Sequence, residues 1–325
     1  MNKHMNKVLA ATVAGVTLLA GAAGAQTAQE ILEQAQKASS EVSNMTVDLV
    51  MNGQASMTVA GSDGQEQSVP VGGKLEMGVY TAMGMPMSVY TTGNMTLNLM
   101  GFPINREITD TYVVITADGM DTYTLDDTDP EAPAWMHIVQ EGTEYGELVE
   151  RSLSGEMSNM QLPMDYVLAE ATQEIDGTEC YVITAQMAAS QMVEYVKSAM
   201  ALAGNAGQEQ MAVIDELLAK AGPYVDGLVV SFEEYVAVDT CLPVQMTLDL
   251  NDSSWGPILD KAMELLASQL NMAGTSLSID DASMSFTFDY YEEPGFEIPQ
   301  EALNAPVTPA EELAAQAQGL IESQM

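Results

Sequence analysis

Methionine sulfur is the most concentrated reactive group in the first third of the chain. Nine methionines lie between Met45 and Met100, and Met83-Gly84-Met85-Pro86-Met87 places three of them at alternate positions. Thioether sulfur is a soft ligand, so three sulfurs on one strand face could bind Cu(I). Because no histidine or cysteine is nearby, two other interpretations fit better: ordinary core packing, or the adaptable lining of a ligand cavity.

Cys180 and Cys241 are the only cysteines in the chain. Cys180 begins one predicted strand, and Cys241 follows the end of the strand predicted to pair with it. An antiparallel register would bring them together, so the sequence predicts a structural disulfide, worth roughly 4 kcal/mol on the chain-entropy model. A metal site or two free thiols are the alternatives, and a metal site is poorly supported without nearby histidines.

Groups suited to hydrolytic catalysis are sparse. His137 is the only histidine after the N-terminal segment, and its place on an apolar strand next to Trp135 favours a partly buried ring over a catalytic base. The chain has no G-x-S-x-G motif and no Gly-rich phosphate loop. The sequence therefore predicts a protein that is not an enzyme and uses no cofactor or metal.

Strands with one apolar side position these residues. Asp176-Gly177, between two β-rich runs, predicts a hairpin, because glycine accepts the positive φ of a tight primed turn. From Leu242 to Leu250 apolar and polar residues alternate strictly, which gives one buried and one wet face. Other strands are predicted at 45–51, 55–59, 74–80, 83–89, 95–99, 108–117, 121–125, 135–140, 166–170, 173–175, 180–185, 228–238 and 283–291.

Amphipathic helices are predicted beside these strands. Thr27 to Val42 is the first, with Ile31 and Leu32 on one face. Others are predicted at 144–160, 188–203, 208–221, 254–272 and after Thr308. One-sided antiparallel strands with amphipathic helices predict an α+β domain, in which a twisted half-barrel sheet wraps around helices that cover its concave face.

The N-terminal segment has the form of a secretory signal peptide. Lys3 and Lys7 precede an apolar core from Val8 to Ala20, and Ala23-Gly24-Ala25 forms a cleavage site. The apolar core is too short to span a bilayer, and Ala22 stands where a bacterial lipobox needs cysteine. The sequence predicts a secreted protein without stable membrane insertion. Its formal charge of −38 repels phosphate backbones, which argues against nucleic acid as a partner.

Two stretches resemble a known family: Asp239-Thr240-Cys241-Leu242-Pro243 at a turn, and Ile298-Pro299-Gln300-Glu301-Ala302 after the last strand. Together with the order of elements, they make residues 27 to 303 similar to the LolA-like superfamily of bacterial lipoprotein and lipid carriers, and within it to secreted Firmicutes lipoproteins of unknown function. The resemblance implies a half-closed sheet whose mouth is plugged by helices, around an apolar cavity for acyl chains. It transfers no catalytic residue.

We therefore expect a signal peptide at 1–25, a LolA-like lipid-binding-type domain at 26–303, and a linker with an acidic helix at 304–325. The expected partner is a hydrophobic or amphiphilic small molecule, such as a lipid, held by burial of apolar surface. An extracellular interaction or sensor module, built on a filled scaffold of the same fold, is the alternative. The candidate cavity residues are Met45, Val47, Leu49, Met77, Met83, Met85, Met87, Leu97, Met192, Val244, Met246, Leu248, Met263, Met284, Phe286 and Phe288.

Overall fold

A computed structural model describes the residues 27–60, 66–99, 102–126, 134–153, 164–188, 191, 229–249, 275–293 and 295–310. The helices in these ranges are α2 (Ala28–Ser40), α3 (Glu144–Leu153) and α7 (Gln300–Leu303). The strands are β1 (Asn44–Ala60), β2 (Glu66–Ala82), β3 (Met87–Leu99), β4 (Phe102–Ile115), β5 (Gly119–Asp126), β6 (Ala134–Glu141), β7 (Asp165–Leu168), β8 (Gln173–Ile175), β9 (Thr178–Ala188), β10 (Val229–Ala237), β11 (Pro243–Asp249), β12 (Thr275–Tyr291) and β13 (Val307–Pro309).

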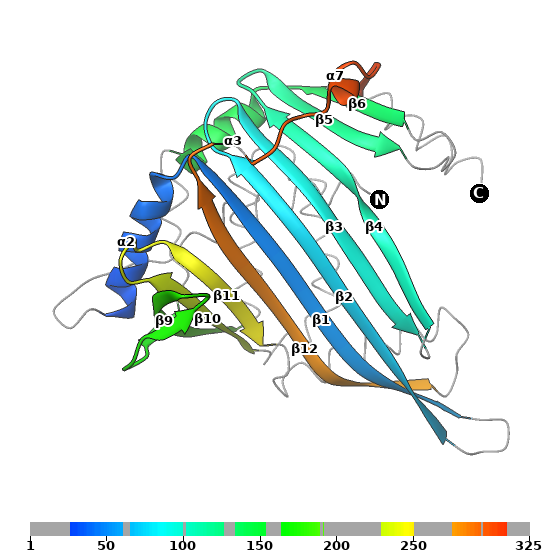
Figure 1. The fold of residues 1–325 in the computed structure, drawn as a ribbon, viewed down its shortest axis with the longest axis vertical. Coiled ribbons are helices and arrows are strands. Elements are labelled where there is room, and N and C mark those ends of the chain that lie inside the picture. The colour runs from blue at the N-terminus through cyan, green and yellow to red at the C-terminus, as the bar shows by residue number, and fades with distance from the viewer. Residues whose placement is uncertain are drawn as a thin grey trace.

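All of these strands belong to one sheet, in the order β13-β6-β5-β4-β3-β2-β1-β12-β11-β10-β9-β7, with β8 also paired to β9. Neighbours are antiparallel except β13 and β6, which run parallel. Figure 1 shows an open, curled sheet, with the long strands β1 to β4 and β12 side by side and β9 to β11 near α2. The predicted twisted antiparallel sheet is confirmed at this level.

Three of the central strands are longer than the sequence predicts. β1, β2 and β12 have 17 residues each, and β1 pairs with both of the others along almost its whole length. The sequence analysis began this strand only at residue 74, whereas β2 begins at Glu66. Pro70 pairs with Ser56 of β1, whereas pairing with β3 begins only at Val71. Proline, which has no N–H group to donate to a neighbouring strand, is tolerated at the end of this described β2–β3 pairing.

The predicted hairpin at Asp176-Gly177 is present between β8 and β9. Both turn residues have positive φ, 48° at Asp176 and 86° at Gly177. Ile175 and Thr178 pair directly across them. The turn therefore has the two left-handed residues that a primed hairpin requires.

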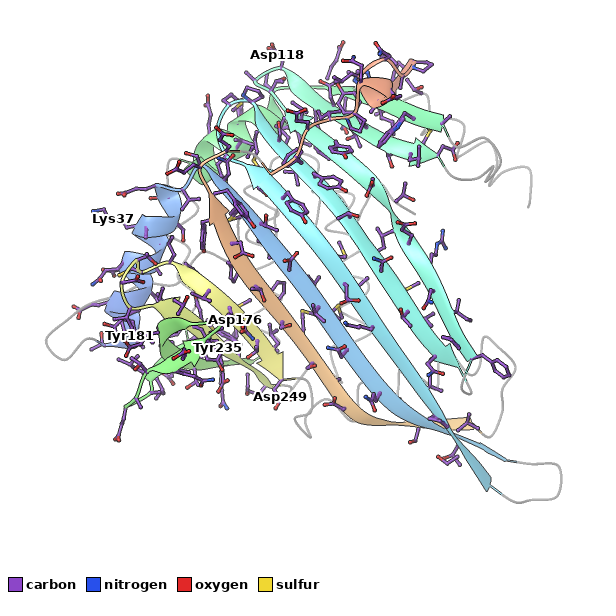
Figure 2. All side chains as sticks on the ribbon, in the orientation of Figure 1. Lys37, Asp118, Asp176, Tyr181, Tyr235 and Asp249 are labelled. Atoms are coloured by element: carbon purple, nitrogen blue, oxygen red, sulfur yellow. The ribbon has the colours of Figure 1, made fainter. Side chains whose placement is uncertain are left out.

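Helix α2 packs on the sheet as its apolar stripe predicts. Ile31 and Leu32 are at most 1% exposed and lie against Ile183 and Phe232 of β9 and β10. Its charged residue Lys37 is exposed and points away from the sheet (Figure 2). The helices predicted at 188–203, 208–221 and 254–272 lie outside the described residues, apart from Ala188, which ends strand β9, and the helical Gln191. None of the described helices is long and apolar enough to cross a membrane.

The segment after β12 lies across the sheet. Ala302 in α7 is fully buried against Tyr112 and Tyr123, on β4 and β5. β13 then pairs with His137 to Val139 of β6. Residues 304–310, which the sequence analysis assigned to a linker and a terminal helix, thus contribute a strand to the sheet.

Candidate functional site

The apolar side chains of the central strands share one side of the sheet, which we call the apolar face. Val47 on β1 pairs with Val79 on β2 and with Phe288 on β12. Met246 on β11 continues this face by pairing with Phe286. Register partners point to the same side of a sheet, so the alternation along each strand combines into one continuous surface.

A buried cluster occupies one end of the apolar face. Its core residues, all at most 9% exposed, are Met45, Val47, Val79, Val89, Phe286 and Phe288. Other predicted cavity residues packed against it are Leu49, Met83, Met87, Met246, Leu248 and Met284. Met77 lies on the same face because it pairs with Leu49, and so does Leu97, opposite Gly73. The structure thus brings most of the predicted residues together.

The sequence analysis expected the methionines around Pro86 to share one strand face, but they do not. Residues 83–86 form the turn from β2 to β3, with a cis bond between Met85 and Pro86 and a φ of 139° at Gly84. Met83 and Met87 pack against the buried cluster, whereas Met85 is 41% exposed. The predicted one-face arrangement is wrong, and the hypothesis of a Cu(I) site loses its geometric basis.

Val244 lies away from the other cavity candidates. The pairing of β10 with β11 shifts between Tyr235 and Val236, so Val244 is the extra residue of a bulge. Its side chain packs against Cys180, Val182 and Tyr235 instead of the cluster around Phe286. Strict alternation predicted that Val244 and Met246 lie on the same face, and this shift in pairing makes that prediction wrong. Met192 and Met263 lie outside the described residues.

The other end of the apolar face is open. Leu97 on β3 is 36% exposed, and Ile104, its partner on β4, is 50% exposed. Phe102 follows on the same side and is 73% exposed. Exposed large apolar side chains in a row are unusual on a water-soluble surface and mark a site of binding or packing.

A carboxyl group is buried on the apolar face beside α2. Glu234 on β10 is 3% exposed and pairs with Ile183 on β9 and Met246 on β11. Its Oε2 atom has no hydrogen-bond partner. Because burial disfavours the charged form, the pKa of Glu234 is raised to about 8. The carboxyl group is therefore mostly protonated at neutral pH.

The opposite face carries a ladder of aromatic rings that the sequence analysis missed. Tyr80, Tyr90 and Tyr112 are neighbours on β2, β3 and β4, with ring centroids 5.4 and 4.5 Å apart. Phe296 covers them, 5.8 Å from Tyr90 and 6.2 Å from Tyr112. The available signal was a tyrosine at a polar-phase position of each strand, but only the register brings the rings together.

His137 extends this face toward the sheet edge. Its ring stacks on Tyr123 at 4.3 Å, and its Nε2 atom lies 2.7 Å from Asp121 Oδ1. Its side chain is 14% exposed, which confirms the predicted partly buried ring. Among the residues with described positions, no group of three or more His, Cys, Asp or Glu side chains could hold a metal ion.

A polar cavity of about 400 Å³ lies near the far end of β1, β2 and β3. Its polar side chains are Asn52, Gln54, Lys74, Thr96 and Asn98. Lys74 Nζ forms an ion pair with Glu76 Oε1 at 2.5 Å, in which both side chains are about half exposed. This cavity has no counterpart among the predicted site residues.

The predicted disulfide is not formed, because Cys180 and Cys241 are both free. Cys180 is fully buried with Val182 and Tyr235. Cys241 lies in the turn after β10, where its Sγ atom donates to Gln34 Oε1 of α2 at 3.5 Å. Since α2 packs on the Ile183 side of the sheet, the two sulfurs lie toward opposite faces.

Comparisons with known proteins place this fold in a wider context. Residues 27–307 match the model of a family of unknown function, DUF6612. No curated protein matches the chain.

Several solved structures are similar to the chain, and they include the following three. Lipoprotein LppX of Mycobacterium tuberculosis is 12% identical, with 82% of this chain and 96% of LppX covered and a TM-score of 0.36. LprF of Mycobacterium bovis is 11% identical, with 83% and 95% covered and a TM-score of 0.34. A beta-barrel-like protein of the domain of unknown function DUF1849 from Brucella abortus is 9% identical, with 76% and 98% covered and a TM-score of 0.19.

Proposed function

We propose that this chain, which belongs to the family of unknown function DUF6612, is an exported, non-enzymatic carrier with a LolA-like fold that holds a hydrophobic or amphiphilic ligand, such as a lipid acyl chain, on its apolar face. The main support is the continuity of that face. It runs from the buried cluster at Met45 to the exposed side chains of Leu97 and Ile104. A ligand on the open end would remove apolar surface from water on both partners.

The energetics of such binding are favourable. Apolar surface leaving water contributes about 25 cal/mol per Å², so burying about 300 Å² contributes roughly 7 kcal/mol before the cost of association. Methionine adapts its shape at low cost, which suits acyl chains of varied form. Met87, Met246 and Met284 are partly buried around the cluster and would supply this adaptability.

The two long insertions support a lid over the open end. One joins the end of β9 to the start of β10, and the other joins the end of β11 to the start of β12. By the antiparallel register, these ends lie at the same end of the sheet as the start of β4, where Phe102 and Ile104 are exposed. In the proposal, the helices predicted at 188–203, 208–221 and 254–272 cover the ligand there, with Met192 and Met263 facing it.

The alternative function is an interaction or sensor module. The close packing at the Met45 end favours it, because that part of the apolar face is filled by the protein's own side chains. The polar cavity on β1, β2 and β3 would then offer a recognition surface that needs no apolar ligand.

Two neighbouring substitutions on β3 separate these functions. Leu97 and Asn98 are both exposed, but they lie on opposite sides of the sheet. We expect Leu97→Glu to weaken the binding of a fluorescent fatty acid by about tenfold, because a charge at the open end opposes an apolar ligand. Asn98→Glu adds the same charge and leaves binding unchanged. Fluorescence titration of both variants measures this.

Native mass spectrometry and lipid extraction, on wild-type protein purified from its own secretion host, complete the test. A bound amphiphile in these spectra is the expected result. The carrier proposal is wrong if no amphiphile copurifies and the fluorescent fatty acid does not bind to the wild type. Equal loss of binding in both β3 variants would place the ligand somewhere other than the apolar face.

A further inference from the structure

We propose that Glu234 is a proton-dependent latch, which holds helix α2 on the sheet while its carboxyl group is protonated and releases the helix when the proton is lost. The observation behind this is a buried carboxyl group whose Oε2 atom has no hydrogen-bond partner and which has no counter-ion among the described residues. Such a group is stable only in its neutral form, unless it can reach water.

Glu234 lies in the layer between α2 and the sheet. Its partner on β9 is Ile183, which belongs to the cluster formed by Ile31 and Leu32 of α2. Its partner on β11 is Met246, which packs against both this cluster and the one around Phe286. The carboxyl group therefore lies where the two apolar clusters meet.

Two further polar groups border this position. Tyr290 of β12 donates its hydroxyl to the Pro243 carbonyl oxygen at 2.9 Å. Burial raises the pKa of Tyr290, and the charge of Glu234 raises it further, which places the two groups within electrostatic reach of each other. Ser39, in the last turn of α2, has a buried hydroxyl without a hydrogen bond of good geometry.

No cation in the described part of the chain neutralises Glu234. On α2, Lys37 and Glu33 are exposed, and Glu30 is partly buried at the other end of the helix from Ser39. The titratable groups on the same face of the sheet near α2 are the phenols of Tyr166, Tyr181 and Tyr290 and, toward the turn at Asp176, the carboxyl groups of Glu174 and Glu179. Arg106 also lies on this face, but it is on β4, which β3, β2, β1, β12 and β11 separate from β10. Because burial raises the pKa of Tyr290, this phenol stays neutral in the pH range where a carboxyl group with a pKa of about 8 loses its proton.

Loss of the proton leaves two outcomes. Either the charge stays buried and unpaired, or water reaches it. The barrier to water on this side is α2, whose contacts with the sheet are those of a narrow stripe made by Ala28, Ile31, Leu32 and Ala35. Detachment of one short helix costs far less than unfolding the sheet, so release of α2 is the expected response.

Release would uncover Met246 and Leu248, which the α2 cluster shares with the rest of the apolar face. If the carrier function proposed above is correct, this gives the ligand a route that opens more often as pH rises toward about 8. This last consequence depends on the proposed function, whereas the latch itself does not.

Hydrogen exchange followed by mass spectrometry tests the latch. Wild type and Glu234→Gln are compared at matched pH values between about 6 and 9, so that the intrinsic pH dependence of exchange cancels. Glu233→Gln is the control, because Glu233 is the exposed neighbour on the same strand. We expect the protection of residues 28–40 to fall about tenfold per pH unit in wild type and in Glu233→Gln from pH 6 to about pH 8 and to level off above it, and to stay constant in Glu234→Gln.

Equal protection of α2 in wild type and Glu234→Gln across this range would overturn the latch. So would a loss of protection that spreads over β1 to β3 as well as α2. Binding of the fluorescent fatty acid, measured on the same samples, separates the two proposals. A wild type that releases α2 but binds no fatty acid at any pH keeps the latch and removes the carrier.

Discussion

At neutral pH, Glu234 keeps a proton that an exposed glutamate would have released, and this has a consequence for stability. Its pKa is about 8 in the folded chain, against an ordinary value of 4.5. The unfolded chain therefore binds fewer protons than the folded chain between these two values. Stability that is fully present below pH 4.5 falls as pH rises to about 8, by up to roughly 5 kcal/mol.

Replacing Glu234 by glutamine should remove this loss of stability at higher pH. Glu234→Gln carries no titratable group, so we expect it to be more stable than wild type by about 2–4 kcal/mol at pH 8, with the difference vanishing near pH 4.5. Urea denaturation at several pH values measures the difference. Glu233→Gln, whose side chain is exposed, should follow the wild type. A constant difference across pH would show that proton binding by Glu234 is not its cause.

The thiols of the two cysteines differ in how accessible they are to solvent. Cys180 is 0% exposed, and burial, with a smaller contribution from Asp239, raises the pKa of its thiol. Cys241 is partly exposed in its turn. We expect N-ethylmaleimide to modify only Cys241 in the native protein and both thiols after denaturation without reductant, as measured by intact mass. Denatured protein that takes up no label would contain the disulfide that this structure lacks.

At the scale of the elements, we expect the short segment from Gly295 to Leu303 to stabilise the sheet through its contacts with aromatic rings. It places Phe296 over Tyr90 and Tyr112, and Ala302 against Tyr123. We expect Phe296→Ala to lower the free energy of unfolding by about 2–3 kcal/mol, through loss of ring contacts and partial burial. Glu297→Ala changes its exposed neighbour and should cost less than about 0.5 kcal/mol. Chemical denaturation of both variants decides whether this segment stabilises the sheet.

Local signals predicted some elements well and others poorly. Helix α2 and the hairpin at Asp176 were predictable, because an apolar stripe and an Asp-Gly turn are properties of neighbouring residues. The first part of β2 was not, because Pro70 and Gly72 favour turns and only pairing with neighbouring strands holds them extended. The bulge that moves Val244 is likewise set by pairing with β10, which no short pattern records.

At the scale of the molecule, the candidate face was predictable and its details were not. Alternation along each strand was enough to place residues such as Val47, Met246 and Phe286 on one side. The buried charge at Glu234 and the tyrosine ladder depend on which strands are neighbours, and strand order cannot be obtained from alternation. The positions of the sulfur atoms from Met83 to Met87 were not predictable, because these residues form a turn whose sequence pattern resembles that of a strand.

The parallel pairing of β13 with β6 matters beyond the three residues that it involves. A broad open sheet ends in rows of unpaired amide and carbonyl groups, which can recruit strands from other copies and seed fibrils. The β13 strand caps His137 to Val139 on one such margin, while the short β7 and β8 occupy the other. The segment 307–309 thus protects the β6 edge against self-association, while the longest strands, β1, β2 and β12, are already paired on both sides.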